Sequence, residues 1–184
     1  ELDRVLEAAR GGSGSFTVRG EVTIPEDSGE LSLDQLTVAE GAVLTITETG
    51  FDIRALDLQG TMIVDNARVN ICDRMTRFTG SLQTKGDEAC VDIFFEDWHD
   101  HKDQIEIVGS PMFHIRYNAT SQQALDTDLE SAQAVYAEDQ RLTPMIYVGF
   151  ACVRDRLEVP DHMEIRFVNW EEDFHGTLSV TDTL

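Results

Sequence analysis

The segment richest in side chains that could do chemistry runs from Trp98 to Asp103 and has the sequence Trp-His-Asp-His-Lys-Asp. Imidazole and carboxylate groups together suit a transition metal. Two histidines two residues apart would point the same way if this segment were an extended, exposed loop. The candidate metal ligands are therefore His99, Asp100, His101 and Asp103. The same spacing is also common in solvated loops, and it lacks the HExxH pattern of a helix-borne zinc site.

The two tryptophans are the candidate ligand-binding residues, because an exposed aromatic ring has an apolar face that can contact a sugar. Trp98 opens the segment described above, and Trp170 is followed by Glu171, Glu172 and Asp173. Glycoside cleavage needs two carboxyl groups on either side of the bond. In a chain with 35 acidic residues such neighbours arise by chance, and Trp170 also fits the end of a core strand. We therefore predict no catalytic residue.

We expect no cofactor. The alternative is a divalent cation such as calcium bound by the acidic loops, since calcium prefers carboxylate oxygens. The closest approach to a calcium loop, Asp126-Thr127-Asp128, lacks the glycine and the distal Glu of the Asp-x-Asp-x-Asp-Gly pattern. GxGxxG, GxxxxGK[ST], GxSxG and CxxC motifs are absent from the sequence. Nucleotide-binding, hydrolase and zinc-finger chemistry therefore have no support.

The net charge is −21, from 35 acidic and 14 basic residues. Nucleic-acid affinity depends on Lys and Arg displacing counterions from phosphates, so we expect no nucleic-acid partner. Basic protein surfaces, cations and neutral glycans are the compatible partners. A charge of this size also serves solubility alone. No run of 18 apolar residues exists, and we expect no membrane span.

The three cysteines, Cys72, Cys90 and Cys152, are too few for a disulfide scaffold and odd in number. Two arrangements remain open: one disulfide bridge with a spare thiol, or three buried thiols. Each cysteine lies in an apolar run, where it packs as a small hydrophobic residue, and this favours the thiols.

The sequence contains a repeated pattern: an alternating apolar run, a glycine and a second alternating run. The strands that this pattern predicts would form the scaffold that holds any functional site. The pattern occupies Phe16–Ile24, Leu36–Ile46 and Leu56–Val64, with a weaker copy at Phe78–Leu82. The glycines fall at 20, 41, 60 and 80. A period near 20 residues indicates a solenoid, in which stacked units bury the apolar faces that one unit cannot.

The phrases LTVAEGAVLTI (36–46) and LDLQGTMIVDNARVNI (56–71) resemble rungs of right-handed parallel β-helix proteins. These include autotransporter passengers, haemagglutinin-like adhesins, pectate-lyase-like enzymes and phage spikes. The resemblance covers residues 16–82. It implies an elongated, secreted or virion-surface architecture and carries over no functional residues.

The alternative fold is an antiparallel β-sandwich or jelly roll, with hairpin turns at Arg19-Gly20, Glu40-Gly41 and Gln59-Gly60. Arg-Gly and Gln-Gly are poorer hairpin turns than Asn-Gly. The pattern therefore favours a mainly-β chain containing a short β-solenoid and one packed helix.

The expected organisation begins with a helix over residues 1–10 and a Gly/Ser linker over 11–15. A single β-rich domain follows over 16–184, interrupted by an insertion at 85–104 and a helix at 121–141. That helix has an apolar stripe at i, i+4, i+7 and i+11, made of Leu125, Leu129, Ala132 and Tyr136.

These features together predict a non-enzymatic structural or interaction protein, a self-associating acidic surface component of a virion, an extracellular filament or an adhesin. Its partner would be a further copy or an assembly protein. The alternative is a glycan-binding module or a polysaccharide-cleaving enzyme on a β-helix. Either function places the protein outside the cell or on a virion surface.

Overall fold

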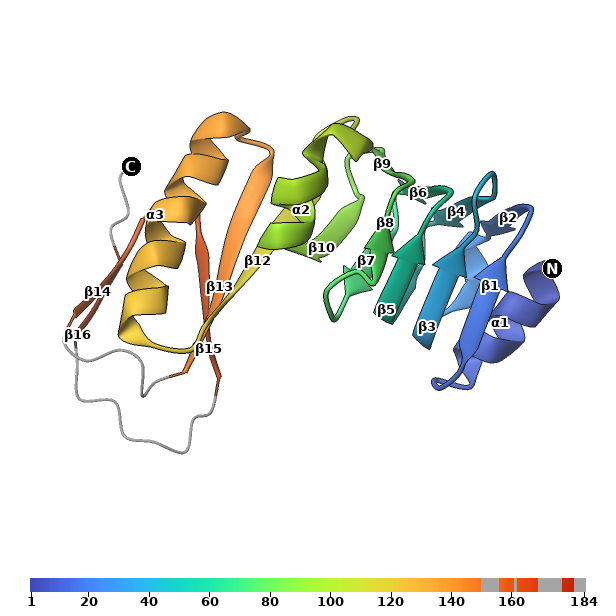
Figure 1. Ribbon diagram of the computed structural model, residues 1–184, viewed down its shortest axis with the longest axis horizontal. Coiled ribbons are helices and arrows are strands. Elements are labelled where there is room, and N and C mark those ends of the chain that lie inside the picture. The colour runs from blue at the N-terminus through green and yellow to red at the C-terminus, as the bar shows by residue number, and fades with distance from the viewer. Residues whose placement is uncertain (150–155, 161, 169–176, 181–184) are drawn as a thin grey trace. The chain divides into compact units, whose positions relative to one another are not determined.

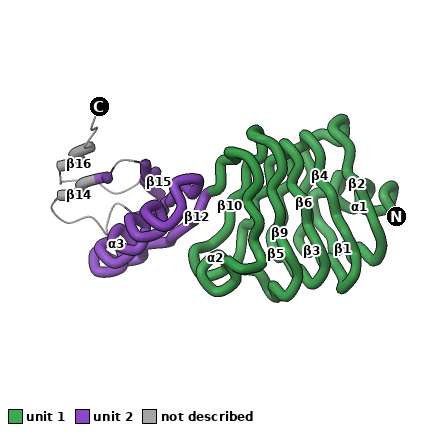
Figure 2. The backbone as a smooth tube through the Cα atoms, turned by 90° about the horizontal axis from the view of Figure 1, so that it is seen from above, with its two compact units in different colours: residues 1–113 green, residues 114–184 purple. Residues whose placement is uncertain are grey.

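The computed structural model describes residues 1–149, 156–160, 162–168 and 177–180. The chain forms two compact units, residues 1–113 and 114–184, shown in green and purple in Figure 2. The boundary falls inside strand β12 (Met112–Ala119). Cys152 and Trp170 lie outside the described residues.

The strands of unit 1 belong to two parallel sheets, and the chain passes back and forth between them (Figure 1). In spatial order, sheet A contains β1 (Ser15–Val18), β3 (Leu31–Val38), β5 (Gly50–Leu58), β7 (Arg68–Ile71) and β10 (Cys90–Phe94), with β8 (Arg77–Phe78) also beside β5. In spatial order, sheet B contains β2 (Glu21–Ile24), β4 (Val43–Thr47), β6 (Thr61–Asp65), β9 (Ser81–Lys85) and β11 (Ile105–Ile107).

The chain is mainly β, as its alternating pattern predicts. The antiparallel sandwich or jelly roll is wrong, because the paired strands run parallel: β3 with β5, and β4 with β6. The expected hairpin turns are instead corners that carry the chain from sheet A to sheet B. Arg19-Gly20 joins β1 to β2, and Gln59-Gly60 joins β5 to β6.

The glycines of the repeat form a column at this corner. Each passage of the chain through sheet A and then sheet B is one turn of the stack. The strand register aligns Gly20, Ala42, Gly60 and Gly80 in successive turns. Backbone hydrogen bonds join the column, with the N–H of Thr61 donating to Ala42 and that of Ser81 to Gly60. Gly41 is therefore not a member. It precedes the column by one residue and adopts φ 75°.

Two of these glycines are required by close backbone approach. A Cβ atom at Gly60 would overlap the carbonyl oxygens of Ala39 and Ala42, and one at Gly80 would overlap that of Gly60. Gly20 begins the column, and a Cβ there would meet only the carboxylate of Glu1, at 3.4 Å. A glycine of the repeat is therefore sterically required inside the column but not at its beginning.

The interior of unit 1 is filled by the alternate apolar residues of both sheets, because the side chains of a strand point to opposite faces in turn. Buried residues stack on buried residues of the next strand. Representative columns are Leu33–Ile53–Ile71 and Val38–Leu58–Phe78 in sheet A, and Leu44–Met62–Leu82 in sheet B.

Ion pairs outside this core join neighbouring turns at the repeat spacing. Arg54 pairs with Asp34 at 3.5 Å, Arg77 with Asp57 at 3.9 Å and Lys85 with Asp65 at 2.8 Å. Each partner lies 20 residues earlier in the chain. Exposed pairs contribute little stability individually, but opposite charges on adjacent strands favour this register over a shifted one.

Helix α1 (Leu2–Arg10) packs against β1, β2 and β3 at the N-terminal end of the stack (Figure 2). Its buried residues are Val5 and Ala9, four apart on one face. The helix therefore covers the apolar interior that the first turn of the chain would otherwise expose. Three short helices lie elsewhere in unit 1: η1 (Glu26–Ser28), α2 (Phe95–His101) and η2 (Lys102–Gln104).

Unit 2 contains the sheet order β12, β13 (Leu142–Gly149) and β15 (Glu164–Val168), and a separate parallel pair, β14 (Arg156–Val159) with β16 (Thr177–Val180). Helix α3 (Gln122–Glu138) packs on β13 and is capped by Ser121, whose side chain accepts from the N–H of Ala124. Its buried residues are Leu125, Ala132 and Val135. Leu129 and Tyr136 of the expected stripe are half-buried.

Candidate functional site

The expected metal segment is helical rather than an extended loop. His99 and His101 lie on α2, where residues two apart are rotated by about 200°. His99 is exposed beside the ring of Phe95, at 5.2 Å, whereas His101 packs on Phe78 at 5.0 Å. The expected extended loop, which would point both histidines the same way, is therefore wrong.

The four candidate metal ligands of this segment also do not converge. In the described part of the chain, no three of His99, Asp100, His101 and Asp103 bring ligand atoms within 4.8 Å of one another. Asp100 and Asp103 are exposed, at the end of α2 and in η2 respectively. The arrangement offers single side chains to solvent rather than a chelating set.

Trp98, one of the two candidate ligand-binding residues, is buried, with 5% of its surface exposed. The ring of Phe95 lies 6.2 Å away, and Lys102 Nζ lies 5.3 Å from the centre of the indole. Its ring therefore packs α2 onto unit 1 and is not available to stack on a sugar. Tyr117, a further aromatic residue of unit 2, is also buried, and its hydroxyl lies 3.2 Å from Ser131 Oγ.

Asp97 is the most enclosed carboxylate of this region, with 2% of its surface exposed. Arg74 Nε donates to its Oδ1 and the backbone N–H of Met75 to its Oδ2, both at 3.0 Å. Partial burial opposes the charge on Arg74, but the hydrogen bond and charge of Asp97, together with the charges of Glu96 and Asp100, outweigh it and raise the pKa of Arg74. Asp97 therefore fastens α2 to the segment between β7 and β8. Nothing in the sequence distinguishes it from the other acids.

Cys72 is half-buried and Cys90 is buried. Both positions fit cysteines that pack as small hydrophobic residues. Asn70 Nδ2 donates to Cys72 Sγ at 3.6 Å.

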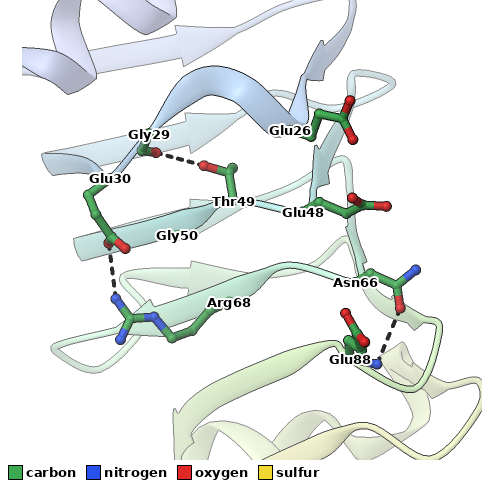
Figure 3. A pocket seen from close by; sticks show the side chains of 9 residues that line it. All are labelled: Glu26, Gly29, Glu30, Glu48, Thr49, Gly50, Asn66, Arg68 and Glu88. Carbon is green, nitrogen blue, oxygen red and sulfur yellow. Dashed lines mark hydrogen bonds and ion pairs between the residues drawn. The ribbon is translucent and has the colours of Figure 1, made fainter.

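A polar hollow of unit 1 lies where sheet B strands turn back toward sheet A. It has a volume of about 400 Å³, is open to solvent, and is lined by Glu26, Gly29, Glu30, Glu48, Thr49, Gly50, Asn66, Arg68 and Glu88 (Figure 3). Glu26 and Glu48 follow aligned strands, β2 and β4, and so occupy the same corner in successive turns. The sequence period brings these residues together although they are 22 positions apart.

Contacts between successive turns shape the opposite side of the hollow. Arg68 Nη2 lies 3.1 Å from Glu30 Oε2 and reaches it across the turn between them. Gly50 occupies that intervening turn, and a Cβ there would collide with the Glu30 carboxylate. Thr49 Oγ1 donates to the carbonyl oxygen of Gly29 at 2.6 Å. Glycine at position 50 therefore leaves the room that the Glu30–Arg68 pair needs.

Neighbouring carboxyl groups in the hollow disfavour the ionised form of Glu48. A hydrogen bond with Glu26, the charge of Glu26, slight desolvation and the charges of Glu88 and Asp65 all raise the pKa of Glu48 above its ordinary value of 4.5. Among the described residues, no three carboxylates here bring oxygens within 4.8 Å of one another. The hollow can attract a cation or share a proton between two carboxyls, but it does not form a chelate.

No protein family, curated protein or solved structure matches the chain. None of the helices in the described ranges is both long and apolar enough to cross a membrane. One scaffold can carry many functions, so the function of this chain depends on its particular side chains and surfaces.

The Glu26–Glu48 pair predicts a pH-dependent stability. A raised pKa means that the folded chain holds the Glu48 proton more tightly than the unfolded chain, so ionisation of Glu48 lowers stability as the pH rises. We expect Glu48→Gln to melt at a higher temperature than the wild type at pH 7. The difference should shrink toward zero by about pH 4, where glutamates become protonated.

Thermal unfolding followed by circular dichroism across this pH range measures the effect. Glu40→Gln is the matched control, because Glu40 is exposed in the corner between β3 and β4 and loses the same charge. A Glu48→Gln advantage that is equal at both pH values, or equal to that of Glu40→Gln, contradicts the prediction.

Proposed function

We propose that residues 15–113 form a short β-solenoid, and that the protein is a non-enzymatic structural and interaction component that associates with copies of itself. The observation that carries this proposal is the in-register stacking of strands from successive turns into two parallel sheets. Stacked repeats of this kind present long, regular surfaces, and each turn contacts mainly its neighbours. Such surfaces suit assembly better than they suit a catalytic cleft.

The buried polar side chains of unit 1 support a structural role. Among the described residues of unit 1, four polar residues are buried as a whole, Ser28, Thr49, Thr84 and Asp97, and each has a hydrogen-bond partner in the fold. The half-buried Gln104 is the exception among the enclosed polar atoms there, because its Oε1 has none. Ser28 donates to Pro25 O, Thr49 donates to Gly29 O, and Thr84 accepts from Val108 N. Catalytic groups are commonly buried polar residues whose environment shifts their pKa, whereas these four brace corners, the end of β11 and helix α2.

The setting we propose is a surface assembly, either a virion, an extracellular filament or an adhesin. The net charge of −21 favours solubility and repels other acidic surfaces, so a further copy would have to dock through a surface without charge. An assembly partner other than a further copy would therefore carry a basic surface. The glycan-binding alternative is weakened by the burial of Trp98.

Size-exclusion chromatography with light scattering tests the proposal on the full chain. We expect a molar mass above the 20.6 kDa of one chain at high protein concentration, falling toward that value on dilution. A single-chain mass at every concentration would exclude self-association and with it the proposed function.

A further inference from the structure

The outward side of sheet B differs in chemistry from the rest of the charged surface of unit 1. Strand residues alternate between the buried interior and the outside, so the outward set follows directly from the burial pattern. We name its uncharged centre the hydroxyl face, made of Thr23, Val43, Thr45, Thr47, Thr61, Ile63, Ser81 and Gln83. The charged outward residues Glu21, Asp65, Lys85 and Glu106 surround it.

The outward side of sheet A provides the contrast. Charged residues lie among its outward positions on β3, β5, β7 and β10, beside uncharged ones such as Thr37, namely Asp34, Asp52, Arg54, Asp57, Arg68 and Asp92. A chain with a net charge of −21 therefore excludes charge from the centre of one sheet surface and not from the other. Charge depletion at the centre with a polar rim is the pattern found at protein interfaces.

The side chains of the hydroxyl face suit the stacking of one sheet on another. Most are β-branched, and such residues pack well on a pleated surface. Threonine presents a methyl group as well as a hydroxyl, and neighbouring hydroxyls already meet within the face, with Ser81 Oγ 3.3 Å from Thr61 Oγ1. Two sheets can pack face to face about 10 Å apart, with their side chains interdigitated.

We infer that the hydroxyl face is the surface through which a second copy of this chain docks, an inference that rests on the proposed self-association. A second copy presents the same flat, uncharged array, which a two-fold axis makes self-complementary. A basic partner gains nothing from an uncharged centre. A sugar would find no aromatic ring among the eight residues. The uncharged centre of the hydroxyl face therefore favours a further copy over a basic partner or a sugar.

The charges at the rim are compatible with this pairing. Asp65 and Lys85 are 2.8 Å apart and neutralise each other within one chain. The remaining acids, Glu21 and Glu106, lie on β2 and β11, the two edge strands of sheet B. They therefore stand at the margins of the contact rather than at its centre.

The size of the outward surface of sheet B, the charged rim included, sets the strength of the contact. Five strands at about 4.8 Å and roughly five residues at about 3.3 Å give an area of roughly 400 Å² per copy. The total of about 800 Å² is below the 1,200 Å² or so of a standard stable interface. The association is therefore weak. Salt should strengthen the association, because salt screens the repulsion between two acidic chains. The uncharged centre of the contact has no ion pairs between the copies that salt could weaken.

Sedimentation velocity of the full chain over a range of concentrations, at low and high salt, tests the inference. Thr45→Arg places a charge at the centre of the hydroxyl face, and Thr61→Arg does so on the neighbouring strand. Thr37→Arg is the matched control, because Thr37 points outward from sheet A and the substitution adds the same charge. Circular dichroism confirms that each variant is folded.

We expect both face variants to weaken association by about tenfold or more, because burying an unpaired charge is costly, and the control to stay within about twofold. If the wild type associates and the face variants associate equally well, the hydroxyl face is wrong while the proposed function stands. If no protein associates at any salt concentration, both fail. Affinity electrophoresis in dextran, retarding the wild type but not Thr45→Arg, would assign the face to a neutral glycan and overturn the inference.

Discussion

Gly80→Ala should destabilise unit 1 by about 3 kcal/mol, since overpacking a tight site costs up to about that amount. The added Cβ would overlap the carbonyl oxygen of Gly60 in the preceding turn. That oxygen accepts the backbone hydrogen bond of Ser81, at 2.9 Å, so it cannot retreat without breaking the column. Urea unfolding followed by far-UV circular dichroism measures the loss.

Gly20→Ala is the control that isolates the stacking contact. Gly20 occupies the same corner of the first turn, but a Cβ there meets only the Glu1 carboxylate, at 3.4 Å. Its cost should stay within about 0.5 kcal/mol, as for a substitution without a steric conflict. If the two variants lose stability equally, the cost comes from backbone freedom shared by all glycines, and the close approach between turns is not its cause.

Asp97→Ala should destabilise the attachment of α2 by about 2–3 kcal/mol, because it removes two hydrogen bonds from an enclosed site. The N–H of Met75 would lose its carboxylate acceptor, and Arg74 would lose its 3.0 Å partner. We expect a lower midpoint in urea and faster hydrogen exchange of the α2 amides.

Asp100→Ala is the matched control on the same helix, because Asp100 is exposed and carries the same charge. Its effect should stay within about 0.5 kcal/mol. Slow exchange of α2 in Asp97→Ala, indistinguishable from the control, would show that the packing of Trp98 and Phe95 holds the helix without the buried carboxylate.

The strands of unit 1 were predictable because period-2 alternation alone determines which residues share a face. The glycine column was predictable only in part. Three of its four members follow from the repeat, but the corner between β3 and β4 contains four residues, Ala39–Ala42, whereas the corner at Gln59-Gly60 contains two. Gly41 falls beside the column for this reason, and Ala42 takes its place.

Helix α2 could have been found in the sequence. Phe95, Trp98 and His101 recur at intervals of three, which fits one face of a helix, but the acidic residues between them suggested a loop. The hollow around Glu26 and Glu48 had no local signal. It arises only when residues 22 positions apart are aligned by the register of β2 and β4, and that register is a property of the whole stack.

Sedimentation equilibrium of the wild-type chain at rising salt concentration tests most directly whether this acidic stack of parallel strands associates with copies of itself. We expect a mass near 20.6 kDa at low protein and low salt concentration, rising toward twice that value as both increase. A mass of one chain under all conditions would contradict self-association, and an association that weakens as salt is added would contradict docking through an uncharged surface.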